Sequence, residues 1–110
     1  MASKSVPIAV RRANRKLAED LTTWRKLKGL TQAQVADRAG VSRSALARLE
    51  GGEGGVTLES LLRVLRALGV LDTLTKALDP YESDVGRLRW GEELPQRIRP
   101  TRLSGGDDDA

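Results

Sequence analysis

Two arginines, a serine and an alanine lie close together in one short segment, and their types suit contacts with nucleic acid. The four residues are Arg43, Ser44, Ala47 and Arg48. On a helix their spacing puts small and cationic side chains on one side, opposite the apolar Leu46 and Leu49. The major groove of DNA accepts a helix that presents such a row.

The chain lacks the residues on which most enzymatic chemistry depends. Its 110 residues contain no histidine and no cysteine. Histidine is the usual proton shuttle and the commonest metal ligand, and cysteine supplies disulfides and zinc sites. No pair of carboxylates converges on one helix face, so we expect no enzymatic activity and no cofactor. We interpret Asp107–Asp109 as a solubilising end rather than a metal site.

Length and composition favour one small domain with a tail. A chain of 110 residues can build a modest core, which must be aliphatic because aromatic residues make up only 3%. No apolar stretch approaches the roughly 20 residues that span a bilayer, and the N-terminus lacks the apolar region of a signal peptide. We therefore expect no membrane association and a cytoplasmic location.

Positive charge is concentrated in the first half of the chain. Residues 1–50 carry 11 Lys and Arg against 4 Asp and Glu, whereas residues 51–110 carry 8 against 11. A polyanion would be attracted to the first half. Charge alone leaves open the alternative that this half is only a solvated basic surface.

Capping residues and glycines divide most of the chain into predicted helices. The first helix runs from about Ile8 with an apolar stripe of Leu17, Leu21, Trp24 and Leu27. Three further helices start after the caps Thr31, Ser42 and Thr57, and glycines 29, 40 and 69 end the first, second and fourth helices. A tight glycine turn joins the short second and third helices. We expect the two helices to cross at a steep angle, so that the third projects from the rest of the domain.

The remaining segments complete an all-α fold class. The glycine-rich run 51–55 ends the third helix, and we interpret it as a flexible connector. The fourth helix carries leucines at 58, 61, 62, 65 and 68, and a short fifth helix covers 71–78. We predict no strand. The sequence thus predicts a five-helix domain over residues 1–80 and an extended or disordered C-terminal tail over 81–110.

The middle of the chain resembles the phage-repressor and Cro-like helix-turn-helix family, also called the XRE family. The resemblance rests, in order, on Gly-Leu-Thr-Gln, Val-Ala, Ala-Gly-Val-Ser-Arg-Ser and Leu-Ala-Arg-Leu-Glu. It extends from about Leu17 through Val70, with the helix-turn-helix itself at 31–50. It implies a repressor-like five-helix domain whose second motif helix enters the major groove of double-stranded DNA.

The resemblance also implies roles for particular residues. The base-reading positions are Arg43, Ser44, Ala47 and Arg48, and the two arginines suit guanine. The phosphate-contacting positions, near helix N-termini, are Thr31, Gln32 and Ser42. Arg25 and Glu50 match a structural ion pair that ties the first helix to the end of the third.

One feature departs from the family pattern. Relatives often place a polar or basic loop after the recognition helix, whereas this chain has glycines and Glu53 there. Additional contacts with DNA are then expected from the basic N-terminal stretch that contains Arg11, Arg12 and Arg15. The alternative is that these arginines form an ordinary solvated helix face.

Two functions follow from the resemblance. The first is a transcriptional regulator, a repressor that binds a palindromic operator as a homodimer with half-sites about 34 Å apart. Apolar residues at 70, 71, 74 and 78 are candidates for the dimer contact. The alternative is an antitoxin of a toxin–antitoxin pair, which binds a toxin protein through its C-terminal region and autoregulates its operon. The tail around Trp90 would make that contact, unless it is disordered and the tryptophan incidental.

Overall fold

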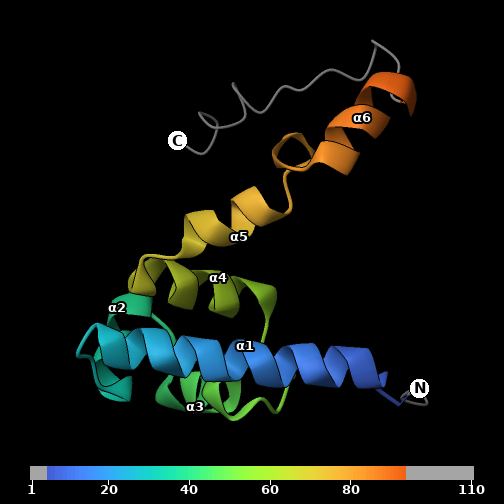
Figure 1. Ribbon diagram of the computed structural model, residues 1–110. Helices are drawn as coiled ribbons and strands as arrows, with labels where there is room; N and C mark the ends of the chain where they lie inside the picture. Colours follow the sequence, from blue (N-terminus) through green and yellow to red (C-terminus); the bar gives the residue numbers. More distant parts are fainter. Residues whose placement is uncertain (1–4, 94–110) are drawn as a thin grey trace. The chain divides into compact units, whose positions relative to one another are not determined.

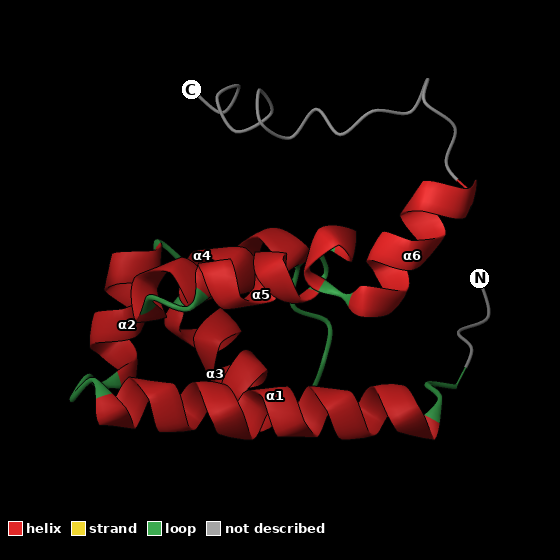
Figure 2. Ribbon diagram, turned by 45° about the horizontal axis from the view of Figure 1, so that its top comes forward, coloured by secondary structure: helices red, strands yellow, loops and turns green. Residues whose placement is uncertain are grey.

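The computed structural model describes residues 5–93, and all regular structure in this range is helical (Figures 1 and 2). The elements are α1 (Ile8–Leu27), α2 (Gln32–Ala39), α3 (Arg43–Gly51), α4 (Leu58–Leu68), α5 (Leu71–Ala77), the 3₁₀-helix η1 (Pro80–Glu82) and α6 (Asp84–Glu93). The predicted all-α class is confirmed, and α1 to α5 lie where the sequence predicts them. None of the helices in the described range is both long enough and apolar enough to cross a membrane.

The chain divides into two compact units, residues 1–72 and 73–110. In the first unit α1 packs against α3 and α4, and α2 packs against the same two helices (Figure 1). The buried apolar side chains of this core are Ala18, Leu21, Val35, Ala36, Ala39, Leu46, Leu49, Val64, Leu65 and Leu68. The small residues on α2 allow it to lie close to its neighbours.

Side-chain caps fix where the short helices begin. The Thr31 hydroxyl accepts from the Gln34 backbone N–H at 3.1 Å, and the Gln34 side chain accepts from the Thr31 N–H at 2.9 Å. This reciprocal pair is the predicted capping box. Ser42 caps α3 and Thr57 caps α4 by the same hydroxyl contact. At the end of α2, Gly40 adopts φ 71°, a left-handed conformation that favours glycine.

The apolar stripes are shorter than the sequence predicts. On α1 Trp24 and Leu27 are exposed, and on α4 Leu58 is exposed while Val64, outside the leucine pattern, is fully buried. Leu58 lies in the first turn of α4 beside a cavity of about 320 Å³, so no neighbour packs over it. A helix buries only the part of its apolar side that other elements cover, and sequence periodicity does not report that length.

The second unit contains helical turns in the first part of the segment predicted as a tail. We expected residues 81–110 to be extended or disordered, and η1 and α6 cover most of 80–93. Local polar contacts start these turns: the Ser83 hydroxyl accepts from the Gly86 N–H at 3.0 Å, and Arg87 donates to the Tyr81 carbonyl and to Asp84. The division between the two units falls within α5, after residue 72, and the predicted domain extends to residue 80. Residues 94–110 lie outside the described range.

We expect Leu46→Ala to lower the free energy of unfolding by about 2–5 kcal/mol, because it leaves a cavity beneath α3. Leu46 is 1% exposed, whereas Leu27 is 72% exposed and provides a matched control. Leu27→Ala should change stability by less than about 0.5 kcal/mol. Chemical denaturation followed by circular dichroism measures both, and equal effects would contradict the assigned core.

Candidate nucleic-acid interface

Helix α3 has one buried and one exposed side. Leu46 and Leu49 are buried in the core, and Ala45 is half-buried. The exposed residues are Arg43, Ser44, Ala47 and Arg48. The structure therefore brings the four predicted base-reading residues together on the solvent side of one short helix. Two guanidinium groups among small side chains leave room for a base edge to approach the backbone.

A half-buried ion pair holds α3 to the rest of the domain. Arg25 Nε donates to Glu50 Oε2 at 2.8 Å, and Arg25 Nη2 donates to Glu50 Oε1 at 3.1 Å. The side chains are 13% and 6% exposed. Arg25 Nη1 also donates to the Leu30 carbonyl at 2.9 Å, so one guanidinium joins α1, the following turn and the end of α3. A bidentate contact of this kind fixes direction as well as distance.

The pKa of Glu50 reflects this environment. Burial by itself raises the pKa of the carboxyl group, but the hydrogen bonds from Arg25 and Gln32 outweigh burial and hold it below its ordinary value of 4.5. The hydrogen bond to Glu50 raises the pKa of Arg25. Both groups are therefore charged at neutral pH.

The three predicted phosphate-contacting residues have different surroundings. Thr31 and Ser42 are exposed at the N-termini of α2 and α3, where their hydroxyl oxygens serve as caps. A hydroxyl that accepts in a cap keeps its own proton to donate. Gln32 differs, because its side-chain nitrogen donates to Glu50 Oε1 at 2.9 Å and the residue is half-buried. Sequence reasoning did not find this contact, since it joins residues on different helices.

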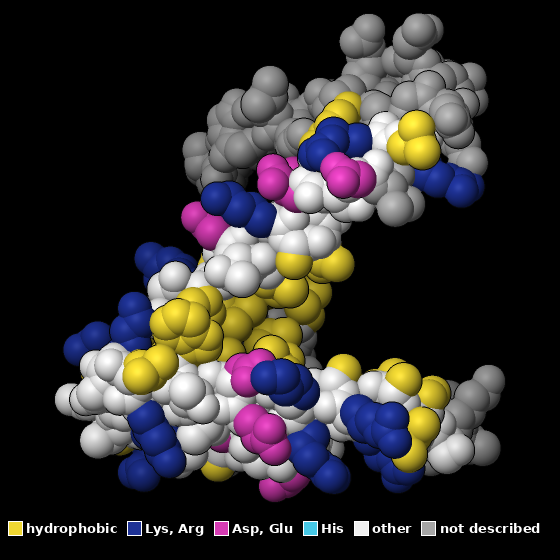
Figure 3. All heavy atoms as spheres, in the orientation of Figure 1, with side chains coloured by type: hydrophobic (Ala, Val, Ile, Leu, Met, Phe, Trp, Pro, Cys, Tyr) yellow, Lys and Arg dark blue, Asp and Glu magenta, His cyan; other side chains and the backbone are white. Residues whose placement is uncertain are grey.

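The basic N-terminal stretch lies on the first turns of α1. Arg11, Arg12 and Arg15 are all exposed. Figure 3 shows Lys and Arg side chains gathered over this end of α1. The glycine run 51–55 passes close to the same helix, because a Cβ built on Gly52 would lie 3.4 Å from the Arg15 Cα. The run is thus packed against α1, and it brings the end of α3 near the basic stretch.

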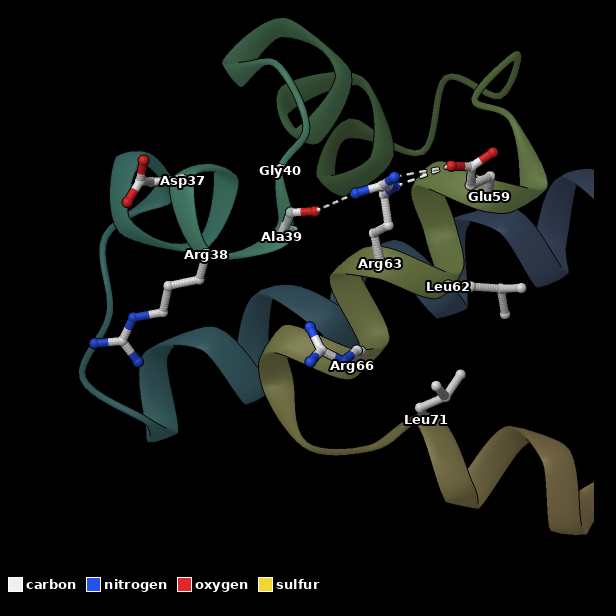
Figure 4. Close-up of a pocket in the computed structure, with 9 residues that line it drawn as sticks. All are labelled: Asp37, Arg38, Ala39, Gly40, Glu59, Leu62, Arg63, Arg66 and Leu71. Carbon is white, nitrogen blue, oxygen red and sulfur yellow. Dashed lines mark hydrogen bonds and ion pairs between the residues drawn. The ribbon is translucent and has the colours of Figure 1, made fainter. Parts of the chain in front are cut away.

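Arg63 of α4 supports the turn between α2 and α3. Its guanidinium pairs with Glu59 at 3.0 Å and reaches the Ala39 carbonyl at 3.5 Å, beside a cavity of about 440 Å³ (Figure 4). A Cβ built on Gly40 would lie 3.0 Å from Arg63 Nη1. Glycine at this position therefore provides the left-handed turn and also the space for the arginine. The sequence predicted only the first of these requirements.

Comparisons with known proteins agree with this geometry. A helix-turn-helix family model matches residues 21–73. The chain is also 40% identical over 55 residues to the transcriptional repressor RstR of the cryptic phage CTXphi from Vibrio cholerae serotype O1. That alignment covers 50% of this chain and 49% of the relative, so the chain matches about half of the repressor's length. No solved structure matches the chain.

We expect Glu50→Gln to lower the free energy of unfolding at pH 7 by roughly 3 kcal/mol, because Arg25 keeps a half-buried charge without a counter-charge. The folded state depresses the pKa of Glu50. Its stabilising effect is therefore complete above the unfolded value and is lost as the pH falls through the folded value. The difference in the free energy of unfolding between wild type and variant should shrink below about pH 4.5, the ordinary pKa of the Glu50 carboxyl group. Denaturation curves from pH 7 to pH 3 measure this difference.

The control for this experiment is Glu59→Gln, which removes a carboxylate from the exposed pair with Arg63. Exposed pairs contribute about 0–1 kcal/mol. If both variants lost the same stability at pH 7, the half-buried pair would have no special structural role.

Proposed function

We propose that this chain, whose residues 21–73 form a helix-turn-helix domain of the XRE family, is a sequence-specific regulator of transcription that binds double-stranded DNA and acts as a repressor. The observation that carries the proposal is the exposed side of α3, where two arginines lie among small residues. The match to a phage transcriptional repressor supports the same function. Repression would require only occupancy of a promoter, which agrees with a chain that has no histidine and no cysteine.

In the proposed complex α3 lies in the major groove. Arg43 and Arg48 donate to the O6 and N7 atoms of guanine, Ser44 donates or accepts at a neighbouring base, and Ala47 contacts a thymine methyl. Thr31 and Ser42 donate to phosphates through their hydroxyl groups. Because the Gln32 side chain is bonded to Glu50, the backbone N–H in the first turn of α2 is the donor that Gln32 offers.

Two further elements complete the proposed binding mode. The exposed Arg11, Arg12 and Arg15 add contacts with phosphates beside the end of α3. A single recognition helix reads few base pairs, so we infer a homodimer on a palindromic operator with half-sites about 34 Å apart. α5 supplies apolar surface for the dimer contact, because it buries no residue and is followed by Leu78, which is 75% exposed.

Selection of bound fragments from random duplexes tests this function. We expect an inverted repeat with guanine-containing half-sites one helical turn apart. Arg43→Ala and Arg48→Ala should each cost about 1–3 kcal/mol on the selected duplex and relax the base preference at one position of each half-site. Fluorescence anisotropy on the selected duplex and on a random duplex measures both effects.

The matched control is Arg66→Ala, which removes an exposed arginine from α4 instead of α3. Its affinity for the selected duplex should equal that of the wild type. If Arg43→Ala weakened binding to selected and random duplexes equally, base reading by that residue would be excluded. Failure to enrich any sequence would overturn the proposed function.

An antitoxin is the second candidate, and the second unit favours it. The described part of the second unit, residues 73–93, exposes Leu78 and Leu88. Exposed apolar side chains outside a DNA-binding domain suit a protein partner. Removal of residues 81–110 should then abolish co-purification with the product of the adjacent gene and preserve most of the affinity for DNA. Unchanged co-purification would exclude this role for the segment.

A further inference from the structure

Glu53 faces the last recognition arginine. The chain leaves α3 through Gly52, and Glu53 is the one residue with a side chain in the run 51–55. Its Oε1 atom lies 3.6 Å from Arg48 Nη1, and Arg48 Nη2 donates to the Gly54 carbonyl at 3.4 Å. The Arg48 guanidinium therefore lies near one carboxylate and one carbonyl at the C-terminal end of α3.

The glycines on both sides leave space for this contact. A Cβ built on Gly51 would lie 3.3 Å from Glu53 Oε2, and one built on Gly55 would lie 3.2 Å from Arg48 Nη2. Both distances are shorter than ordinary van der Waals contacts of a Cβ atom. Gly51 is the last residue of α3, where glycine costs up to about 1 kcal/mol relative to alanine. A glycine at position 51 leaves space for the Glu53 carboxylate, which is a physical reason for a residue without a side chain there.

The charge of Glu53 affects two kinds of DNA contact differently. Binding to random sequence is almost entirely an attraction between cations and phosphates. A carboxylate beside Arg48 cancels that attraction locally, because it partly neutralises the guanidinium. A base contact depends instead on the direction of the guanidinium N–H groups at short range. Contacts with Glu53 and Gly54 reduce the orientations of Arg48 without using all five of its donors.

We propose that Glu53 is a specificity-determining residue of this DNA-binding surface. It lowers the attraction of Arg48 for phosphates, so that random DNA is bound more weakly relative to the operator. The inference rests on the proposed function, since it assigns Glu53 a part in the same recognition of DNA.

The test compares wild type and Glu53→Gln on the selected duplex and on a random duplex of the same length over a range of salt concentrations. On the random duplex we expect the variant to bind about three- to tenfold more tightly. The slope of log K against log salt should become steeper by about 0.9, the value for one additional phosphate contact. Affinity for the selected duplex should change less than twofold, so the ratio of the two affinities falls by at least about 1.5-fold.

Two further variants separate this effect from a general change of net charge. Glu59→Gln removes the same charge from the ion pair between Glu59 and Arg63 on α4. It should leave the ratio of the affinities for the two duplexes unchanged. In an Arg48→Ala background, Glu53→Gln should no longer alter binding to the random duplex by more than about 1.5-fold, because the proposed effect acts through Arg48. Persistence of the full effect without Arg48 would overturn the proposal.

The remaining outcomes also decide the question. If Glu53→Gln changed the affinity for both duplexes equally, Glu53 would contribute only net charge. If the variant lost affinity for the selected duplex alone, Glu53 would contact a base itself. Either result overturns the proposal. A wild-type protein that does not discriminate between the duplexes contradicts the proposed function instead. If the wild type discriminates and Glu53→Gln keeps the same ratio, this inference alone fails.

Discussion

The half-buried contact between Arg25 and Glu50 is the constraint on which the DNA-binding surface depends. Apolar burial of Leu46 and Leu49 holds α3 in the core, but it is non-directional. The ion pair adds direction, because both Glu50 oxygens accept hydrogen bonds from a guanidinium whose third nitrogen donates to the Leu30 carbonyl. Gln32 adds a third donor from the start of α2. The ends of α1 and α3 and the start of α2 thus meet at one carboxylate.

This constraint matters because α3 is short. A helix of nine residues is not stable in isolation, so its existence and its direction both come from the domain around it. The residues that would read bases lie on the side opposite the core, and any rotation of α3 would move them together. A base contact tolerates little displacement of its donors. The affinity for DNA therefore depends on interactions that never touch DNA.

Much of this domain was predictable because its signals are local. Caps at Thr31, Ser42 and Thr57 and the glycines that follow the helices act within one turn, so they fixed the element boundaries closely. The extent of burial was less predictable. Trp24, Leu27 and Leu58 continue the apolar stripes of their helices but are exposed, because no other element covers them. Residues 81–93 were also less predictable, because their composition is typical of a tail, whereas Ser83 and Arg87 make local contacts within helical turns.

Side-chain contacts between distant residues were the least predictable part of the site. The spacing of Gln32 suits a phosphate contact, but the bond from its amide to Glu50 joins residues 18 positions apart. Of the two glutamates near the end of α3, the resemblance implied the pair of Glu50 with Arg25, whereas the contact of Glu53 with Arg48 was not predicted. Glu50 is directed into the domain, where Arg25 neutralises it, and Glu53 is exposed beside Arg48. Residue type is the same for both, so it is burial and the neighbouring arginine that give one carboxylate an architectural role and leave the other exposed on the surface that we propose binds DNA.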